Sequence, residues 1–233
     1  MGTIGTHAIN ATLFSRLPYD PIRDFAAVAF VVGADGLLVV HPSLPVKSVK
    51  ELIALARARP GELTYASAGA GTTSHLAGEL FKSMTKGDIT HVPYKGNAPA
   101  ITDLLSGQTS MLFATLPTVL PQVQANRLRG LAVLGSTRSP AIPEMPTLAE
   151  SGLKGFEVSN WTGVFASAGT PAAVVSKLNA EIVRVMRLPE VQARLPKEGL
   201  SFAPSTPQQF AAFVKSEKEK WGQLVKAIGV KVD

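Results

Sequence analysis

Short apolar runs rich in β-branched residues alternate, from residue 46 onward, with segments whose apolar residues recur at helical spacing. This alternation predicts an α/β fold with mostly parallel strands, because parallel strands need crossover connections that are usually helices. Strands are expected at residues 63–66, 89–92, 110–113 and 131–134. No internal repeat or low-complexity tract interrupts the pattern.

The helices between and after these strands have recognisable start signals. Ser48 and Glu51 form a capping box, and Pro60-Gly61 ends that helix. Thr170-Pro171 and Thr206-Pro207 open two long helices toward the C-terminus, the second with Gln209 in the capping-box position. Further capping residues are expected at Thr72 or Thr73 and at Asn97, and one more helix at residues 117–126.

Composition bounds the class of protein. The 233 residues, 45% of them hydrophobic and 17% charged, can bury a full core as one large domain or as two small lobes. The longest apolar runs, such as Val28–Val32 and Leu37–Val40, are far shorter than the roughly 20 residues that cross a bilayer. No direct membrane insertion is therefore expected. The absence of cysteine excludes disulfides, thiolate metal sites and cysteine nucleophiles.

The net charge of +6 raises the question of nucleic-acid binding. Lys and Arg are, however, scattered over amphipathic segments and are not clustered with aromatic residues between them. That scatter is typical of solvated helix faces, so no nucleic-acid partner is expected. A mildly positive field would still help to attract small anions.

The segment from Tyr65 to His75 leads from a strand through two glycines into a helix start. Glycines let a ligand approach the backbone, and the free N–H groups of a first helical turn, together with the helix dipole, favour an anion. Each charge-assisted hydrogen bond from such a donor contributes about 1.5–3 kcal/mol, so two or three could hold a carboxylate without Arg or Lys. An ordinary tight turn between a strand and a helix would have the same spacing.

The same segment departs from the nucleotide-binding motifs. Gly69 and Gly71 give G-x-G, but Ser74 stands where the dinucleotide fingerprint has its third glycine, and the Gly-Lys-Ser/Thr of a P-loop is absent. An enzyme that binds a phosphate-bearing cofactor through the turn from Gly69 to Thr73 is therefore the weaker alternative. No cofactor is expected.

A second loop, Val92–Ala98, again joins a strand to a helix and places the side-chain donors of Tyr94 and Asn97 near a helix start. The two helix starts could therefore face one cleft. The alternative is plain turn chemistry at residues 93–96, with Lys95 in solvent.

Catalytic and metal-binding patterns are weak. Two S-x-x-K matches, at Ser83 and Ser151, lack the partner motifs of a serine hydrolase, and no G-x-S-x-G occurs. His75 and Glu79 share a helix face, but the other histidines show no ligand spacing, so no metal site is expected. His75 is interpreted as a packing or capping residue, and no catalytic residue is assigned.

Eight short segments together identify a family. In the first half they are Gly2–Asn10, Leu17–Pro21 followed by Asp24-Phe25, Ser43–Leu52 and Val92–Gly96, and in the second half Asn160–Gly163, Gly169–Pro171, Lys177–Glu181 and Lys220–Gly222. The chain resembles, over essentially its whole length, the receptors of tripartite tricarboxylate transporters, the Bug/TctC type. This resemblance implies a periplasmic receptor that captures a small organic carboxylate and presents it to a membrane permease, without enzymatic activity.

The resemblance also implies a type 2 periplasmic binding protein fold, in which two crossover strands join two α/β lobes. The crossovers are expected near residues 39–42 and 158–165. Lobe one would comprise residues 1–42 with 157–233, and lobe two residues 43–156. Residues 136–156, rich in Pro, Gly and Ser, are interpreted as a linker-like return path between the lobes.

In this family, loops of both lobes contact the ligand through backbone amides and ordered waters. The residues that match those loops here are Thr3, Thr6, His7, Ser67, Ala68, Gly69, Gly71, Thr72, Thr73, Tyr94, Gly96, Asn97, Ala98, Ala114 and Trp161. Many relatives have an Asp where Ala114 stands, and that carboxylate could meet an amino group. A plain mono- or dicarboxylate is therefore expected in preference to an amino acid.

Family members usually carry an export signal and then a strand, a loop and a helix ahead of the segment that matches Gly2. The first strand-helix unit of lobe one is accordingly expected to be missing, and no export signal is expected within this sequence. We expect a gene start placed too late, a shortened chain, or a neighbouring chain that fills the vacant sheet position in a swapped dimer. A sensory receptor of the same fold is the alternative function.

Overall fold

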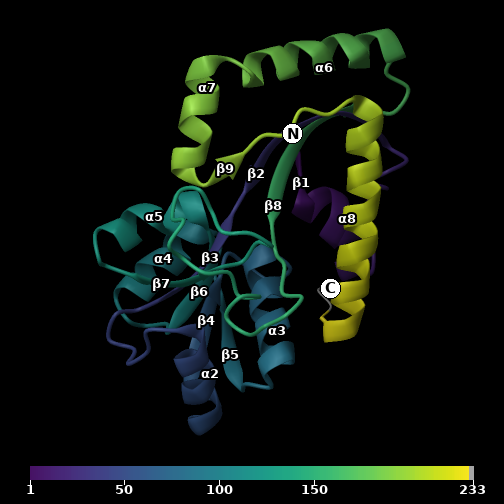
Figure 1. Cartoon of the computed structure of the whole chain (residues 1–233). Helices are drawn as coiled ribbons and strands as arrows, with labels where there is room; N and C mark the ends of the chain where they lie inside the picture. Colours follow the sequence, from purple (N-terminus) through teal and green to yellow (C-terminus); the bar gives the residue numbers. More distant parts are fainter. Residues whose placement is uncertain (231–233) are drawn as a thin grey trace. The chain divides into compact units, whose positions relative to one another are not determined.

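The computed structural model describes residues 1–230, which form two compact units (Figure 1). Unit 1 contains Met1–Gly33 and the chain from Asn160 onward, and unit 2 contains Ala34–Ser159. The chain therefore passes from one unit to the other twice. No helix of the described residues is long and apolar enough to cross a membrane.

Unit 2 is built on a five-stranded sheet in the order β5-β4-β6-β3-β7. The strands are β3 (Gly36–Val40), β4 (Leu63–Ser67), β5 (Ile89–Pro93), β6 (Met111–Thr115) and β7 (Arg129–Val133). β4 runs parallel to β5 and β6, whereas β3 is antiparallel to both β6 and β7. The strands β4, β5, β6 and β7 thus share one direction, as predicted. β3 runs against them, although the helix at Val49–Ala58 lies between β3 and β4 in the chain.

The helices of unit 2 are α2 (Val49–Ala58), α3 (Thr73–Thr85), α4 (Asn97–Leu105) and α5 (Leu116–Gln124). Ser48 caps α2 and Thr72 caps α3, and each side chain accepts from the backbone N–H three residues ahead. The Ser48 cap was predicted from the sequence, and Thr72 is one of the two residues expected to cap α3. The expected capping box of α2 is wrong in its second half, because the Glu51 carboxylate accepts from the Lys47 amide and not from the Ser48 amide. The prediction that Asn97 caps α4 is wrong, because Gly96, with a φ of 119°, takes the cap position and Asn97 is already helical.

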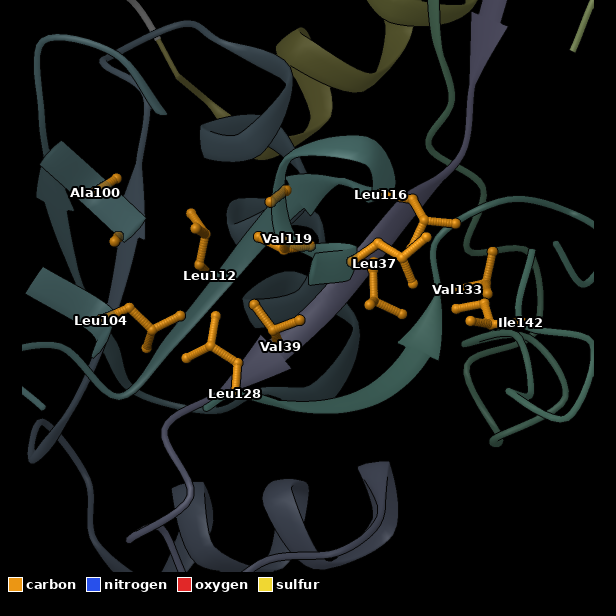
Figure 2. Close-up of a cluster of buried hydrophobic side chains, with 13 residues drawn as sticks. Leu37, Val39, Ala100, Leu104, Leu112, Leu116, Val119, Leu128, Val133 and Ile142 are labelled. Carbon is orange, nitrogen blue, oxygen red and sulfur yellow. The ribbon is translucent and has the colours of Figure 1, made fainter. Parts of the chain in front are cut away.

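Helices cover both faces of the unit 2 sheet (Figure 1). Successive side chains of a strand point to opposite faces, so Tyr65 and Phe113 lie beside α3, with the Phe113 and Phe81 rings 5.6 Å apart. Their neighbours Ala66 and Leu112 belong to the core cluster on the other face. Figure 2 shows this second cluster, in which Leu104 of α4 and Val119 of α5 pack over Leu37, Val39 and Leu112.

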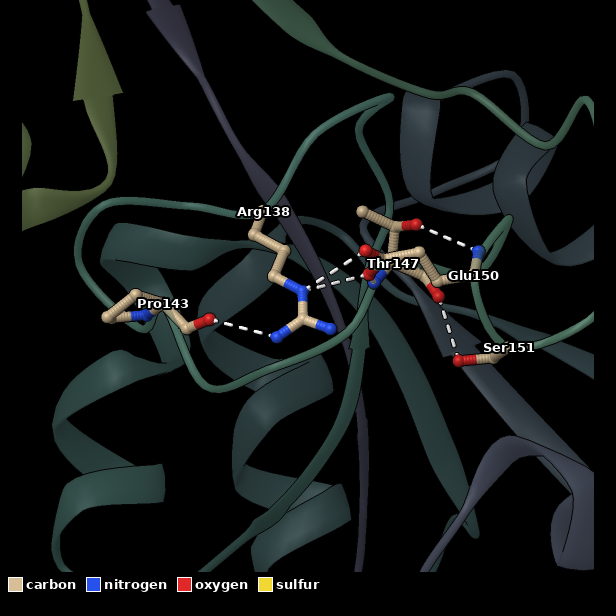
Figure 3. A network of polar contacts seen from close by, with 5 residues as sticks. All are labelled: Arg138, Pro143, Thr147, Glu150 and Ser151. Atoms are coloured by element: carbon tan, nitrogen blue, oxygen red, sulfur yellow. Dashed lines mark hydrogen bonds and ion pairs between the residues drawn. The ribbon is translucent and has the colours of Figure 1, made fainter.

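The Pro-, Gly- and Ser-rich segment at residues 136–156 is an ordered part of unit 2. Arg138 donates from Nε to Glu150 Oε2 at 3.0 Å and from Nη1 to the Pro143 carbonyl at 3.3 Å (Figure 3). Glu150 also accepts from the Thr147 amide at 2.8 Å, while Leu148 and Phe156 are buried. The expectation of a linker-like path is therefore wrong, because the segment has its own hydrogen-bonded turns and apolar anchors.

The two units differ from the expected lobes at their boundaries. The chain enters unit 2 at Ala34 and leaves it at Ser159, whereas the sequence placed these points at residues 43 and 156. The reason is the pairing of β3, whose residues Gly36–Val40 form ladders with β6 and β7 inside unit 2. At the return, the Val158 amide still donates to the Leu134 carbonyl of unit 2.

Unit 1 is built on a four-stranded sheet in the order β1-β8-β2-β9. Its strands are β1 (Gly2–Thr3), β2 (Phe25–Ala34), β8 (Asn160–Ser167) and β9 (Leu200–Ser201). Its helices are the π-helix η1 (Gly5–Ile9), α1 (Asn10–Leu13), α6 (Ala172–Met186), α7 (Pro189–Arg194), the 3₁₀-helix η2 (Leu195–Glu198) and α8 (Pro207–Ile228). The predicted capping box of α8 is confirmed, since Thr206 and Gln209 bond each other's backbone amides.

A buried carboxylate joins the tryptophans of unit 1. Glu217 of α8 is only 7% exposed, and its Oε2 accepts from Trp161 Nε1 at 3.1 Å and from Trp221 Nε1 at 3.2 Å. Burying an indole N–H without an acceptor is costly. Glu217 therefore satisfies a donor on β8 and a donor on α8 with one oxygen.

We predict that Glu217→Leu lowers the free energy of unfolding of unit 1 by about 2–4 kcal/mol, because it leaves two buried indole donors without an acceptor. The chain has only two tryptophans and both lie in unit 1, so urea unfolding followed by tryptophan fluorescence reports on this unit. Glu219→Leu, at an exposed position of α8, is the matched control. Equal losses in the two variants would contradict the prediction.

Gly78 provides a test of packing in unit 2. A Cβ at this position of α3 would overlap the fully buried Tyr65 ring. Gly78→Ala should gain about 1 kcal/mol of helix propensity but lose about 1–3 kcal/mol through overpacking. We predict a net decrease in the melting temperature followed by circular dichroism. Gly222→Ala on α8, where a Cβ would meet only the movable Thr12 hydroxyl at 3.0 Å, should be neutral or stabilising.

Candidate functional site

β4 and β5 end together at one edge of the unit 2 sheet. They pair in parallel from Leu63 with Ile89 to Ser67 with Pro93, so the loops that follow them leave the sheet side by side. Backbone hydrogen bonds join these loops, from the Tyr94 amide to the Ser67 carbonyl at 3.0 Å and from the Gly96 amide to the Ala68 carbonyl at 2.9 Å. The two predicted helix starts, at α3 and α4, are therefore brought together.

Glycine is required at two points of this contact. Gly69 has a φ of 135°, and a Cβ there would lie 3.1 Å from the Tyr94 carbonyl oxygen. Gly96 has a φ of 119°, which lets the chain turn directly into α4. The close approach of the two loops thus depends on the absence of a side chain at Gly69.

The amides of the first loop are mostly occupied by side chains of the same loop. The Ala68 amide donates to Ser74 Oγ at 2.9 Å, the Gly69 amide to Ser67 Oγ at 3.2 Å and the Gly71 amide to His75 Nδ1 at 3.0 Å. This differs from the sequence expectation, in which these donors were free for an anion. The reason is that Ser67, Ser74 and His75 are short or well placed enough to reach back to the turn.

The start of α4 is different, because no side chain caps it. The backbone N–H groups of Asn97 and Ala98 have no hydrogen-bond acceptor among the described residues. Pro99, the third residue of the helix, has no N–H group to be satisfied. These two amides, together with the positive end of the helix dipole, form the part of the site that can accept an anion.

The side chain of Tyr94 is not available in the way the sequence suggested. Its hydroxyl donates to Asp103 Oδ2 of α4 at 2.7 Å. Partial burial and the neighbouring Asp103 carboxylate raise the pKa of Tyr94 to about 12, so the hydroxyl keeps its proton and this bond. Tyr94 therefore fixes the second loop onto α4.

Ala114 and Thr115 are the last two residues of β6, which pairs in parallel with β4. Ala114 is 4% exposed and packs in the core cluster of Figure 2, and Thr115 accepts at its carbonyl from the Thr118 hydroxyl at 2.7 Å. The Leu116 amide at the start of α5 donates to the Asp35 carbonyl at 2.8 Å. The first amide of this helix is thus already satisfied by the backbone.

Sequence reasoning missed a stack of three rings next to the first loop, in which Tyr65 and His75 are buried and His91 is half-buried. The His91 ring is 4.1 Å from the His75 ring and 4.7 Å from the Tyr65 ring, and all are nearly parallel. His91 Nε2 is 2.7 Å from Ser67 Oγ. Burial lowers the pKa of His75, and burial together with the His75 charge lowers the pKa of His91 to about 4. The available signal was the alternation of β4 and β5, which puts Tyr65 and His91 on one face.

Carboxylate and ammonium groups border this stack. The Tyr65 hydroxyl donates to Glu79 Oε1 at 2.6 Å, and Lys82 Nζ bonds the same oxygen at 3.0 Å. Burial by itself raises the pKa of Glu79, but these two hydrogen bonds outweigh burial, so the pKa is lowered overall. Burial and Glu79 raise the pKa of Tyr65. The rings of Tyr65, His75 and His91 are therefore uncharged at pH 7, and they lie next to the ion pair between Glu79 and Lys82.

The site residues expected in unit 1 form a local cluster of their own. The Thr3 amide donates to Thr6 Oγ1, and Thr6 Oγ1 contacts His7 Nδ1, both at 2.9 Å. His7 is buried and stacks on Phe165 at 3.8 Å, and burial is the main reason that its pKa is lowered to about 4. The Trp161 indole donates to Glu217 and is only 3% exposed.

Comparisons with known proteins agree with this architecture. The family described as tripartite tricarboxylate transporter family receptor matches residues 3–230. The chain is 34% identical to the protein BugT of Bordetella pertussis over 97% of this chain and 69% of BugT. It is 38% identical to a protein encoded in the tcbD-tcbE intergenic region of Pseudomonas sp. strain P51, over 93% of this chain but 65% of that relative. The chain thus spans less than two thirds of the length of the Pseudomonas relative.

Solved structures show the same fold. An R. palustris protein solved with adipate is 38% identical, with a TM-score of 0.93 over 99% of this chain and 77% of that chain. MatC from Rhodopseudomonas palustris, with bound malate, is 32% identical, with a TM-score of 0.87 over 96% of this chain and 77% of that chain. The periplasmic binding protein BugD is 30% identical, with a TM-score of 0.90 over 98% of this chain and 77% of that chain. The chain therefore has a periplasmic binding protein fold and belongs to the family of tripartite tricarboxylate transporter receptors.

Proposed function

We propose that this chain captures a small organic carboxylate at the paired helix starts of unit 2. The observation that carries the proposal is the uncapped start of α4, where the Asn97 and Ala98 amides have no acceptor among the described residues. Each charge-assisted hydrogen bond to such an amide contributes about 1.5–3 kcal/mol. The exposed side chain of Lys95 adds a positive charge to the same loop.

Solved relatives support the carboxylate class of ligand. The R. palustris structure contains adipate and MatC contains malate, and both are dicarboxylates. We extend this ligand class to the present chain as a proposal. We also propose that the receptor works in the periplasm and presents its ligand to the membrane permease of a tripartite tricarboxylate transporter, as the family description suggests.

The two loops favour a plain carboxylate over an amino acid. Neither Ser67–Thr73 nor Tyr94–Ala98 contains Asp or Glu, so neither offers a counter-charge to an ammonium group. The Asp103 carboxylate of α4 is already bonded by the Tyr94 hydroxyl. Desolvating an unpaired ammonium here would cost binding energy.

The contact between Ser67 and His91 superficially resembles a nucleophile beside its general base. Ser67 is fully buried, and its hydroxyl is already engaged with the amide and the carbonyl of Gly69 at 3.2 Å each. A substrate carbonyl cannot reach a nucleophile in that position. The pair therefore supports a structural role, in agreement with a receptor family.

A backbone substitution tests the helix-start site directly. Asn97→Pro removes the amide donor at the first helical position, where proline is well tolerated, and should weaken adipate binding about 10- to 100-fold. Asn97→Ala is the matched control, because it removes the side chain and keeps the N–H group. Isothermal titration calorimetry gives both affinities. Similar losses in the two variants would assign the effect to the Asn97 side chain and contradict backbone capture.

Ligand selectivity tests the preference for a plain carboxylate. We predict that succinate and adipate bind more tightly than aspartate and glutamate at pH 7.5, because the site has no carboxylate to pair with an ammonium group. Calorimetric titration of the four compounds gives the ranking. Tighter binding of aspartate than of succinate would overturn the preference.

A further inference from the structure

Two side chains hold the turn of the first loop from behind. The Ser67 hydroxyl accepts from the Gly69 amide at 3.2 Å, and His75 Nδ1 accepts from the Gly71 amide at 3.0 Å. These amides lie on either side of the exposed residue Ala70. Gly71 has a φ of 77°, a conformation that glycine adopts readily because it has no Cβ.

The bond to Gly71 fixes the protonation state of His75. A backbone N–H can only donate, so Nδ1 of His75 must be the unprotonated nitrogen of the ring. The neutral ring then carries its proton on Nε2. Protonation at Nδ1 would place two hydrogens between nitrogens that are 3.0 Å apart and would break the bond. His91 is not restricted in this way, because its partner Ser67 Oγ can donate or accept.

The groups that face His75 come from three elements. Tyr65 of β4 donates to the His75 carbonyl at 3.4 Å, and His91 of β5 stacks on the ring at 4.1 Å. On α3 itself, Glu79 favours a charged His75 and Lys82 disfavours it, while burial is the largest effect and lowers the pKa of His75. These surroundings keep the ring neutral at pH 7, the state that the Gly71 bond needs.

We propose that His75 is a positioning residue, whose neutral imidazole fixes the Gly69–Thr72 turn through the Gly71 amide and thereby keeps the adjoining carboxylate site assembled. The inference rests on the proposed function of the two loops. The stability of the closed turn should therefore depend on pH. Because the pKa of His75 is lowered in the folded chain, the unfolded or opened turn binds the proton more readily, so acidification below about 6.5 favours the opened turn.

Two substitutions of His75 distinguish the contribution of its Nδ1 acceptor from that of its aromatic ring. Asn at position 75 can place its Oδ1 where Nδ1 lies, and it does not titrate, whereas Phe keeps the ring and has no acceptor. We expect His75→Phe to weaken adipate binding about tenfold at pH 7.5 and His75→Asn to retain it. His41→Gln, which changes a histidine bonded to Ser43 outside the stack, is the control and should leave the affinity unchanged.

The pH profile gives a readout that a merely structural role would not move. Adipate itself loses charge near pH 4–5, roughly where free carboxyl groups titrate, and this effect cancels in the ratio of the wild-type and His75→Asn dissociation constants. We expect the ratio to rise about threefold or more between pH 7.5 and pH 4.5. A ratio that stays constant would overturn the inference.

A ligand-free measurement distinguishes failure of the inference from failure of the proposed function. The Gly71 amide resonance in heteronuclear NMR of the unliganded chain should titrate below pH 6.5 in the wild type and not in His75→Asn, and its hydrogen exchange should be fast in His75→Phe. If this holds while no carboxylate binds at any pH, the proposed function fails and the positioning role stands. An equally protected Gly71 amide in the wild type and His75→Phe would overturn the positioning role.

Discussion

Parallel pairing of β4 with β5, in register from Leu63 with Ile89 to Ser67 with Pro93, ends both strands at one edge of the unit 2 sheet. The candidate site depends on this pairing, because helices α3 and α4 both start within a few residues of that edge. In open α/β sheets, ligands bind outside the carboxyl ends of the strands for the same geometric reason. The backbone bonds from Tyr94 to Ser67 and from Gly96 to Ala68 then hold the two starts together.

The two helix starts are not equivalent, although their sequences suggested similar roles. At α3, polar side chains close most of the turn, whereas at α4 a glycine cap and Pro99 leave the first amides open. The rigid turn at α3 and the open donors at α4 are complementary. In the proposed site, one loop would supply a fixed wall and the other would supply hydrogen bonds, which is the preorganisation that small-ligand sites need.

Local signals account for what was predictable. Ser48, Thr72 and Thr206 cap the helices that the sequence assigned to them, because capping depends on residues only three positions apart. Long-range features were less accessible. The insertion of β3 between β6 and β7 and the folded state of residues 136–156 depend on partners distant in the chain. The apolar run Leu37–Val40 was visible, but its pattern does not specify which strands it pairs with.

The candidate site shows the same limit. The positions of Gly69, Gly96 and the helix starts followed from spacing, and the family resemblance supplied the residues to consider. Which amides are occupied could not be read from spacing, because it depends on the rotamers of Ser67, Ser74 and His75. The stack of Tyr65, His75 and His91 needs the register of β4 with β5 as well as the position of α3.

The burial of three imidazoles also affects the overall charge of the chain. Burial lowers the pKa of His7 and of His91 to about 4, and it lowers that of His75 as well. His7 and His91 therefore contribute almost no additional positive charge as the pH falls from 7 to about 5.5, and the formal net charge of +6, counted with neutral histidines, is not raised by these two side chains. Electrophoretic mobility should be nearly insensitive to these two groups over that range. Their contribution to the long-range attraction of the chain for anions is equally constant during mild acidification.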